Sequence, residues 1–139
     1  MIKTETMPAE KARNLNTDAL AFMGDAVYEH FIRQMLLGRG ISKAERLHRE
    51  ATRYVSAVAQ AQIIHGLFDS LTEEEQKHVR RWRNHRFQSQ AKNADPMTYK
   101  WATAFEALVG YLYLTGDEQR LDWLMEQAAS IIDRGEAKE

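Results

Sequence analysis

Two carboxylates stand inside apolar helical patterns of the sequence, where burial would make them costly. Asp25 lies in ALAFMGDAVYEHFIRQMLL, residues 19–37, and Glu106 lies in ATAFEALVGYLYL, residues 102–114. Moving an unpaired carboxylate from water into an apolar environment costs on the order of several kcal/mol. An acid kept in such a setting indicates a partner that compensates its charge.

A divalent cation is one such partner. If both carboxylates look inward and the two helices pack together, the acids repel and one takes up a proton. A cation between them removes that conflict, and magnesium favours a few carboxylates together with retained waters. Gly24 and Gly110, one in each pattern, would let the two backbones approach closely. The alternative is that each acid accepts hydrogen bonds from neighbouring helix ends, and the pattern alone leaves both interpretations open.

The elements that must position these acids are helices. Period-two alternation is nearly absent, and apolar residues recur at three- and four-residue steps. Residues 1–139 are therefore predicted to form one all-α domain, with a core over about 15–133. Helix caps are expected at Ser42, Thr72 and Asp95, and a helix stop at Gly116. The expected helices run from Asn16 or Thr17 to Leu37, from Ser42 past Ile63 with a break near Ser56, from Thr72 into a basic stretch, from Pro96 to Thr115 and from Asp117 to Asp133.

Composition narrows the class of protein. The chain has no cysteine, which excludes a disulfide framework and a thiolate metal site. It has no apolar run of the roughly 18 residues that a membrane span needs, and its first residues lack the apolar core of a signal peptide. We therefore expect a cytoplasmic protein.

The net charge of −1 hides an uneven distribution of charge. The stretch KHVRRWRNHRFQSQAKN, residues 77–93, contains no acid. Guanidinium groups interleaved with Trp82 and Phe87 can pair with phosphates and pack against sugars. The alternative is a solvated helix end whose cations complement the helix dipole. The RNA-binding candidates are Arg80, Arg81, Arg83, Arg86 and Lys92.

The two acidic helices resemble the signature motifs of the ribonuclease III family. FMGDAV at residues 22–27 resembles that family's FLGDAVL, and AFEALVGYLYL at residues 104–114 resembles its second motif, TFEALLGAIYL. The motifs come in the same order, about eighty residues apart. The resemblance is closest to the short bacterial branch, the Mini-ribonuclease III proteins, which lack an appended double-stranded-RNA-binding domain.

This resemblance implies a magnesium-dependent endoribonuclease that cleaves double-stranded RNA and leaves 5′-phosphate and 3′-hydroxyl ends. It implies that Asp25 and Glu106 are catalytic and bind the metal. The two apolar helices with their glycines, together with Trp101, Trp123 and several tyrosines, offer more apolar surface than so small a monomer should leave open. The resemblance implies a helical bundle in which this surplus forms the interface of a two-fold homodimer. The substrate that the resemblance implies is the precursor of large-subunit (23S) ribosomal RNA, with a ribosomal protein as a possible aid in presenting it.

Two departures from the larger family leave an alternative open. Where that family usually has acids, this chain has Ala21 and Thr103, so the site is short of protein ligands. Asp18, two helical turns before Asp25, could compensate, or could simply complement the helix N-terminus. The alternative function is a non-catalytic RNA-binding or ribosome-assembly dimer on the same fold. Two Glu-x-x-His pairs, at 45–48 and 75–78, also occur in di-iron bundles, but both glutamates are better explained as cap residues.

Overall fold

The computed structural model describes residues 5–85 and 95–137 of the chain, and within them every regular element is a helix. The predicted all-α class is confirmed. The helices are α1 (Ala9–Arg13), α2 (Thr17–Gly38), α3 (Ala44–Val55), α4 (Ala57–Leu67), the short 3-10 turn η1 (Phe68–Ser70), α5 (Glu73–Arg83), α6 (Pro96–Thr115) and α7 (Glu118–Ala137).

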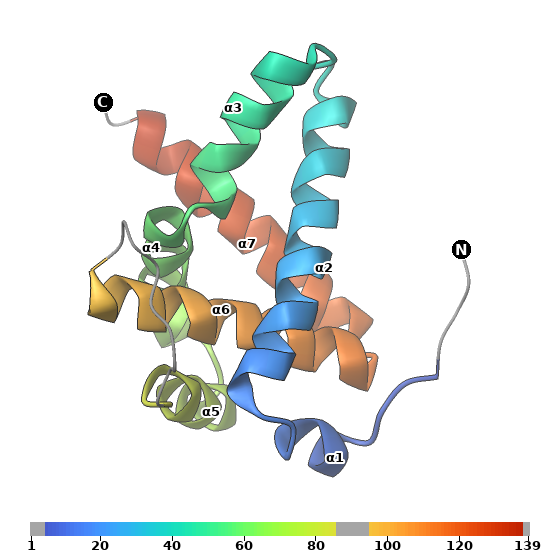
Figure 1. The fold of residues 1–139 in the computed structure, drawn as a ribbon, viewed down its shortest axis with the longest axis vertical. Coiled ribbons are helices and arrows are strands. Elements are labelled where there is room, and N and C mark those ends of the chain that lie inside the picture. The colour runs from blue at the N-terminus through green and yellow to red at the C-terminus, as the bar shows by residue number, and fades with distance from the viewer. Residues whose placement is uncertain (1–4, 86–94, 138–139) are drawn as a thin grey trace.

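Helix α6 is the centre of the fold. It contacts α1, α2, α4, α5 and α7, and most of its residues between 102 and 112 are buried. Figure 1 shows the N-terminal half of α2 crossing α6 near the middle of α6. At this crossing the ring of Tyr28 meets that of Phe105 edge-on, with centroids 5.1 Å apart.

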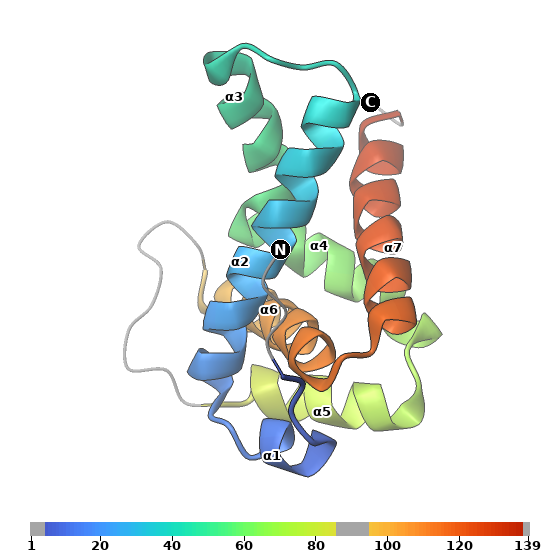
Figure 2. The ribbon, with the colours of Figure 1, turned by 90° about the vertical axis from the view of Figure 1, so that its right-hand side faces the viewer.

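The remaining helices close the two ends of the molecule. Figures 1 and 2 place α1 and α5 at one end and α3 at the other. The α3 end is held by a polar network, in which Asp133 of α7 accepts a 2.5 Å hydrogen bond from the Tyr54 hydroxyl and pairs with Arg39 at 2.9 Å. The Tyr28 hydroxyl donates to the carbonyl of Tyr54 and ties α2 to α3. No helix in the described parts of the chain combines the length and apolar character that crossing a bilayer requires.

Several helix boundaries follow from local chemistry, as predicted. Asn16 caps α2 by accepting a bond from the backbone of Ala19. Thr72 and Glu75 form the complete capping box at the start of α5. Asp95 caps α6 before Pro96, and Gly116 ends that helix with a φ of 76°, a left-handed conformation that glycine adopts without strain. The break at Ser56 is also present, because Ser56 ends α3 and caps α4.

Three boundaries differ from the prediction. Ser42 does not cap a helix, because α3 begins at Ala44 after an extended Lys43 with no side-chain cap. Ile41 is buried in the core, and its burial sets where the chain turns into α3. Helix α7 continues four residues past the expected end at Asp133, which is anchored to Arg39. The short helix α1 was not predicted.

Candidate active site

Two glycines create a backbone-to-backbone contact between α2 and α6. A methyl group added at Gly24 would lie 1.7 Å from the carbonyl oxygen of Glu106, and one added at Gly110 would lie 2.1 Å from the carbonyl oxygen of Leu20. Backbone cannot yield as a flexible side chain can, so only glycine fits at either position. The close approach predicted for these glycines is confirmed. It places Asp25, which follows Gly24, beside Glu106.

The carboxyl groups of Asp25 and Glu106 are hydrogen-bonded to each other. Burial raises the pKa of Glu106 most, and the hydrogen bond and the negative charge of Asp25 raise it further, from its usual value near 4.5 to about 9. The amide of Gln60 acts in the opposite direction and lowers the pKa of Glu106. At neutral pH Glu106 therefore holds a proton.

The two acids differ in their access to solvent, which corrects one prediction. Glu106 is half-buried, but Asp25 is exposed and does not look inward. The buried stripe of α2 is formed by Leu20, Gly24, Tyr28 and Ile32. Asp25 is one residue away from that stripe, a rotation of about 100° around the helix. The pair is consequently open on the Asp25 side and enclosed on the Glu106 side.

Few other polar groups surround this pair. The buried amide of Gln60, on α4, donates to the carbonyl oxygen of Val55 at 3.3 Å and lowers the pKa of Glu106. Glu29, one turn beyond Asp25, adds negative charge near Glu106 and is itself paired with Arg33 at 2.8 Å. Ala21 and Thr103 are buried, and the Thr103 hydroxyl donates to the carbonyl of Tyr99. Neither position offers a ligand.

This donor set fits a magnesium ion. In the parts of the chain that the structure describes, no group of three or more acidic, histidine or cysteine side chains is gathered as a metal cluster. Magnesium does not need one, since it keeps several waters and is commonly held by one or two carboxylates together with substrate phosphates. Asp25 and Glu106 are the groups that would hold it, and its charge would displace the proton of Glu106.

The basic candidates are only partly placed. Arg86 and Lys92 lie outside the described residues. Arg80 and Arg81 are exposed on α5, and Arg83 is half-exposed. The guanidinium of Arg80 lies 5.4 Å from the ring centre of Phe68 and that of Arg83 lies 4.8 Å from that of Trp101, while Arg81 donates to the carbonyl of Arg13.

Other sequence candidates take structural roles. Trp82 is 1% exposed and belongs to the core, so it cannot pack against RNA sugars. Asp18 is exposed in the first turn of α2 with its carboxylate 3.9 Å from His85, which agrees with a role at the helix end. In the Glu-x-x-His pair at 75–78, Glu75 is bound to Arg120 and His78 stacks on Trp82. This arrangement gives no di-iron site.

Gln60 is a site residue that the sequence analysis missed. It is 3% exposed in the apolar helix α4 and lowers the pKa of Glu106. The signal that marked Asp25 was also present here, because AVAQAQIIHGL, residues 57–67, places a polar side chain within an apolar helical pattern. Glutamine carries no charge, so its place in an apolar pattern indicates a smaller burial cost than that of a carboxylate.

Comparison with known proteins defines the class to which this fold and this pair of acids belong. Residues 18–117 match the family model of the Ribonuclease III domain. That range contains both Asp25 and Glu106. The chain belongs to the ribonuclease III family, and it is an endoribonuclease.

The individual relatives belong to one branch of that family. The chain is 52% identical over 117 residues to the Mini-ribonuclease 3 of Symbiobacterium thermophilum, a match that covers 84% of this chain and 90% of the relative. It is 49% identical over 118 residues to the Mini-ribonuclease 3 of Brevibacillus brevis, covering 85% and 88%. A crystal structure of a Fusobacterium nucleatum protein superposes with a TM-score of 0.76 at 30% identity, covering 89% of this chain and 96% of that one. The predicted resemblance to the Mini-ribonuclease III branch is confirmed.

Proposed function

We propose that this endoribonuclease cleaves double-stranded RNA with magnesium held by Asp25 and Glu106. The observation that carries the proposal is the hydrogen-bonded pair of carboxyl groups at the glycine-lined crossing of α2 and α6. Two acids forced together in this way are unfavourable in the free protein, and a divalent cation relieves the repulsion. The proposal takes the whole chain as one catalytic domain.

Asp25 and Glu106 would have different roles at the site because they differ in their exposure to solvent. Bound magnesium would supply a water of lowered pKa and would neutralise charge on the leaving 3′-oxygen of the phosphodiester. Asp25 faces solvent, where a phosphate of the substrate can arrive, and Glu106 holds the enclosed side. Glu106 must give up its proton before it can bind a cation. The expected products carry 5′-phosphate and 3′-hydroxyl ends.

Contact with RNA is assigned to the basic stretch that begins in α5. A-form RNA is recognised mainly by shape, through phosphates and 2′-hydroxyls across its wide minor groove. Arg80 and Arg81 are exposed on α5, and His85 at its end lies 3.9 Å from Asp18 in the first turn of α2. The end of α5 therefore lies about two helical turns from Asp25. We propose that Arg80, Arg81, Arg83, Arg86 and Lys92 bind phosphates.

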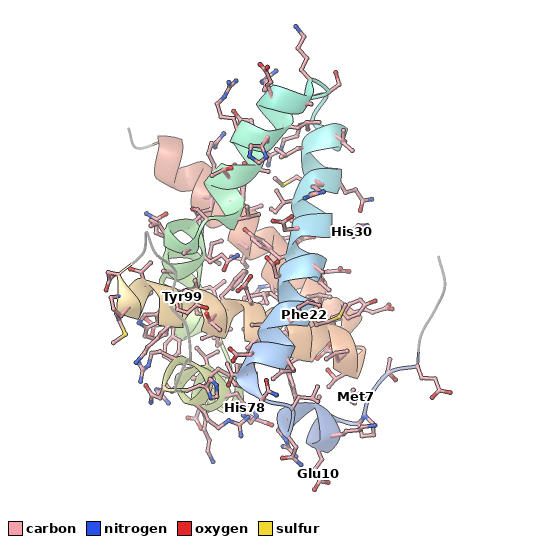
Figure 3. The ribbon with its side chains drawn as sticks, viewed as in Figure 1. Met7, Glu10, Phe22, His30, His78 and Tyr99 are labelled. Carbon is pink, nitrogen blue, oxygen red and sulfur yellow. The ribbon has the colours of Figure 1, made fainter. Side chains whose placement is uncertain are left out.

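A homodimer is supported by one open face of α2. Phe22 is 82% exposed, and Ala26 and His30 follow it at four-residue steps. Figure 3 shows Phe22 and His30 on the side of α2 that faces away from α3 and α4. Beside this face is an apolar groove between α2, α6 and α7, lined mainly by Met23, Val27, Phe31, Tyr113, Leu121 and Met125.

We propose that a second copy of the chain covers this face and groove around a two-fold axis. Trp101 and Trp123, the candidates from composition, do not form this surface. Both are partly buried, with Trp101 against His65 and Trp123 beneath Arg120. Phe22 replaces them as the central contact, because so exposed an aromatic side chain indicates an interaction surface.

The biological setting is part of the same proposal. The relatives named Mini-ribonuclease 3 support an RNA-processing role. We propose that the substrate is the precursor of 23S ribosomal RNA, that processing takes place in the cytoplasm, and that a ribosomal protein aids presentation of the duplex.

The test of this function is the incubation of the purified protein with long double-stranded RNA, with and without magnesium. We expect cleavage only with magnesium, 5′-phosphate ends on the fragments, and no comparable cleavage of a single-stranded RNA of the same sequence. Binding of the duplex without cleavage at any magnesium concentration would instead support the non-catalytic RNA-binding or ribosome-assembly dimer. That alternative is favoured by Ala21 and Thr103, which supply no ligands.

A further inference from the structure

Three aromatic rings from three different elements meet where α6 faces α4 and α5. The ring centroids of His65, on α4, and Trp101, on α6, lie 4.6 Å apart. Those of Phe68, in η1, and Trp101 lie 6.0 Å apart, with the rings at 86° to each other. Both ribbon views place α6 between α4 and α5 (Figures 1 and 2). We call these three rings the aromatic platform. Trp101 is held in it by rings from two other elements, which restricts its movement.

Two guanidinium groups of α5 lie over this platform. That of Arg83 lies 4.8 Å from the ring centre of Trp101, and that of Arg80 lies 5.4 Å from that of Phe68. Arg80 and Arg83 are three residues apart in α5 and therefore project from one face of that helix. In the described parts of the chain neither guanidinium is paired with a carboxylate, although five other arginines are. Their positive charges are therefore not compensated by an acid there.

A second stack of arginine on tryptophan, outside the platform, differs in this respect. The guanidinium of Arg120 lies 3.9 Å from the ring centre of Trp123, but it also binds the carboxylate of Glu75 at 2.6 Å. That stack joins α7 to α5 and its charge is neutralised within the protein. Among the described residues, the side chain of Arg83 donates only from Nε, to Oδ1 of the neutral Asn84 at 3.0 Å. The terminal nitrogens of Arg83 keep their N–H groups for a ligand with negative charge.

We propose that the aromatic platform positions the guanidinium groups of Arg80 and Arg83 for phosphates of the RNA duplex. The inference rests on the proposed role of the basic stretch in RNA binding. A guanidinium is planar, so its face can rest on a ring while the N–H groups at its edge bind phosphate oxygens in a bidentate way. Because the rings already restrict these side chains, less freedom is lost when RNA binds, and the affinity rises. Phe68 and Trp101 are thus positioning residues that act through the two arginines.

The test uses Trp101→Leu, which removes the ring beneath Arg83 but keeps an apolar side chain. Trp101→Phe keeps a ring, and Trp123→Leu is the matched control because it removes the ring beneath the acid-paired Arg120. Binding of a long RNA duplex is measured at several salt concentrations in the Asp25→Asn background, which prevents cleavage. We expect Trp101→Leu to weaken binding about two- to fivefold, as the loss of one exposed cation–π contact predicts. Trp101→Phe and Trp123→Leu should bind as the background protein does.

A double-mutant cycle separates positioning from packing. Arg83→Ala should weaken duplex binding and reduce the log–log salt slope by about one unit or less. In the Trp101→Leu protein the same change should cost about two- to fivefold less than it does with Trp101 present, because the arginine is no longer held. In the active protein, steady-state kinetics should show the effect of Trp101→Leu in KM, with kcat at saturating RNA retained.

Independent effects of Trp101→Leu and Arg83→Ala on binding, or wild-type binding by a folded Trp101→Leu protein, would overturn the proposal. Should Trp101→Leu fail to fold, the indole N–H signals of the Asp25→Asn protein in nuclear magnetic resonance spectra decide the matter. The Trp101 signal should shift on addition of duplex RNA while the Trp123 signal does not, and Arg83→Ala should remove the shift. A Trp101 signal that does not respond to RNA would overturn the proposal equally.

These outcomes are distinct from a failure of the proposed function. A wild-type protein that binds and cleaves duplex RNA, with Trp101 and Arg83 acting independently, contradicts only the role of the aromatic platform. A wild-type protein that binds the duplex without cleaving it, with the coupling between Trp101 and Arg83 intact, contradicts only the proposed cleavage. A protein that neither binds nor cleaves duplex RNA contradicts both.

Discussion

Gly24 of α2 and Gly110 of α6 face each other with no side chain between them. A methyl group at Gly24 would lie 2.9 Å from the backbone nitrogen of Gly110 and 1.7 Å from the carbonyl oxygen of Glu106. Close packing of two backbones is what brings Asp25 and Glu106 within hydrogen-bonding distance of each other. The chemistry of the site therefore depends on two residues that have no functional group.

The first prediction concerns that contact. Gly24→Ala should lower the free energy of unfolding by about 3 kcal/mol or more, because the added methyl group meets backbone that cannot move without separating the helices. Cleavage should fall with it, since Asp25 and Glu106 move apart. Thermal denaturation and a duplex-cleavage assay measure both effects.

The control for this prediction is Gly38→Ala at the end of α2, where an added methyl group meets nothing within 4 Å. It should change stability by less than about 1 kcal/mol, and in the stabilising direction, because alanine favours helix more than glycine does. A Gly24→Ala protein as stable and as active as Gly38→Ala would refute the packing argument.

The second prediction follows from the raised pKa of Glu106. An acid whose pKa is higher in the folded state than in the unfolded state makes the folded state less stable as pH rises between the two values. For Glu106 that window runs from about 4.5 to about 9. Without metal, Glu106→Gln should therefore be more stable than the wild type, by about 1–3 kcal/mol at pH 7 after allowance for solvent beside Asp25.

Thermal denaturation in a chelator at several pH values measures this difference. It should be small near pH 4.5, grow up to about pH 9 and then level off. Added Mg²⁺ should stabilise the wild type and leave the variant unchanged. A stability difference that does not depend on pH would contradict the raised pKa of Glu106.

The third prediction tests the dimer. Phe22→Glu places a charge at the centre of the proposed interface and should produce a monomer in analytical ultracentrifugation at micromolar concentration. Val58→Glu is the matched control, since Val58 is also an exposed apolar residue, at 57%, but lies on α4. It should leave the dimer intact. A Phe22→Glu protein that sediments as the wild type would place the interface elsewhere.

The fourth prediction concerns the basic stretch. Changing Arg80, Arg81 and Arg83 together to alanine should weaken duplex binding and reduce the log–log salt slope by about two units, at roughly 0.7 to 0.9 per phosphate contact. Binding is measured in the Asp25→Asn background, which prevents cleavage. The control changes Arg46 and Arg49, exposed on α3 at the other end of the molecule. An unchanged slope in the triple variant would show that these cations only solvate the end of α5.

Much of this fold could be predicted from the sequence because its boundaries depend on local chemistry. Thr72 and Glu75 form a capping box from their own side chains, and Pro96 and Gly116 fix the ends of α6 through backbone geometry. The close packing of α2 against α6 could also be predicted from the sequence. Each apolar helix has a glycine within four residues of its acid, which indicated both a close crossing and the groups that would meet there.

What could not be predicted depends on tertiary contacts. The start of α3 is set by burial of Ile41, which overrides the capping tendency of Ser42. Trp82 lies in a basic stretch yet is buried, because α5 packs against α6. Gln60 and Glu106 are 46 residues apart, and no local pattern joins them. Gln60 affects the pKa of Glu106 only once α4 and α6 have packed.

The most direct test of the central claim compares two aspartates of α2. Asp25 and Asp18 are both exposed, but only Asp25 is hydrogen-bonded to Glu106. Cleavage of long double-stranded RNA in magnesium is measured for Asp25→Asn and Asp18→Asn at equal helical content. We expect Asp25→Asn to abolish cleavage and Asp18→Asn to retain most of the wild-type rate. Near wild-type cleavage by Asp25→Asn would contradict the assignment of the site.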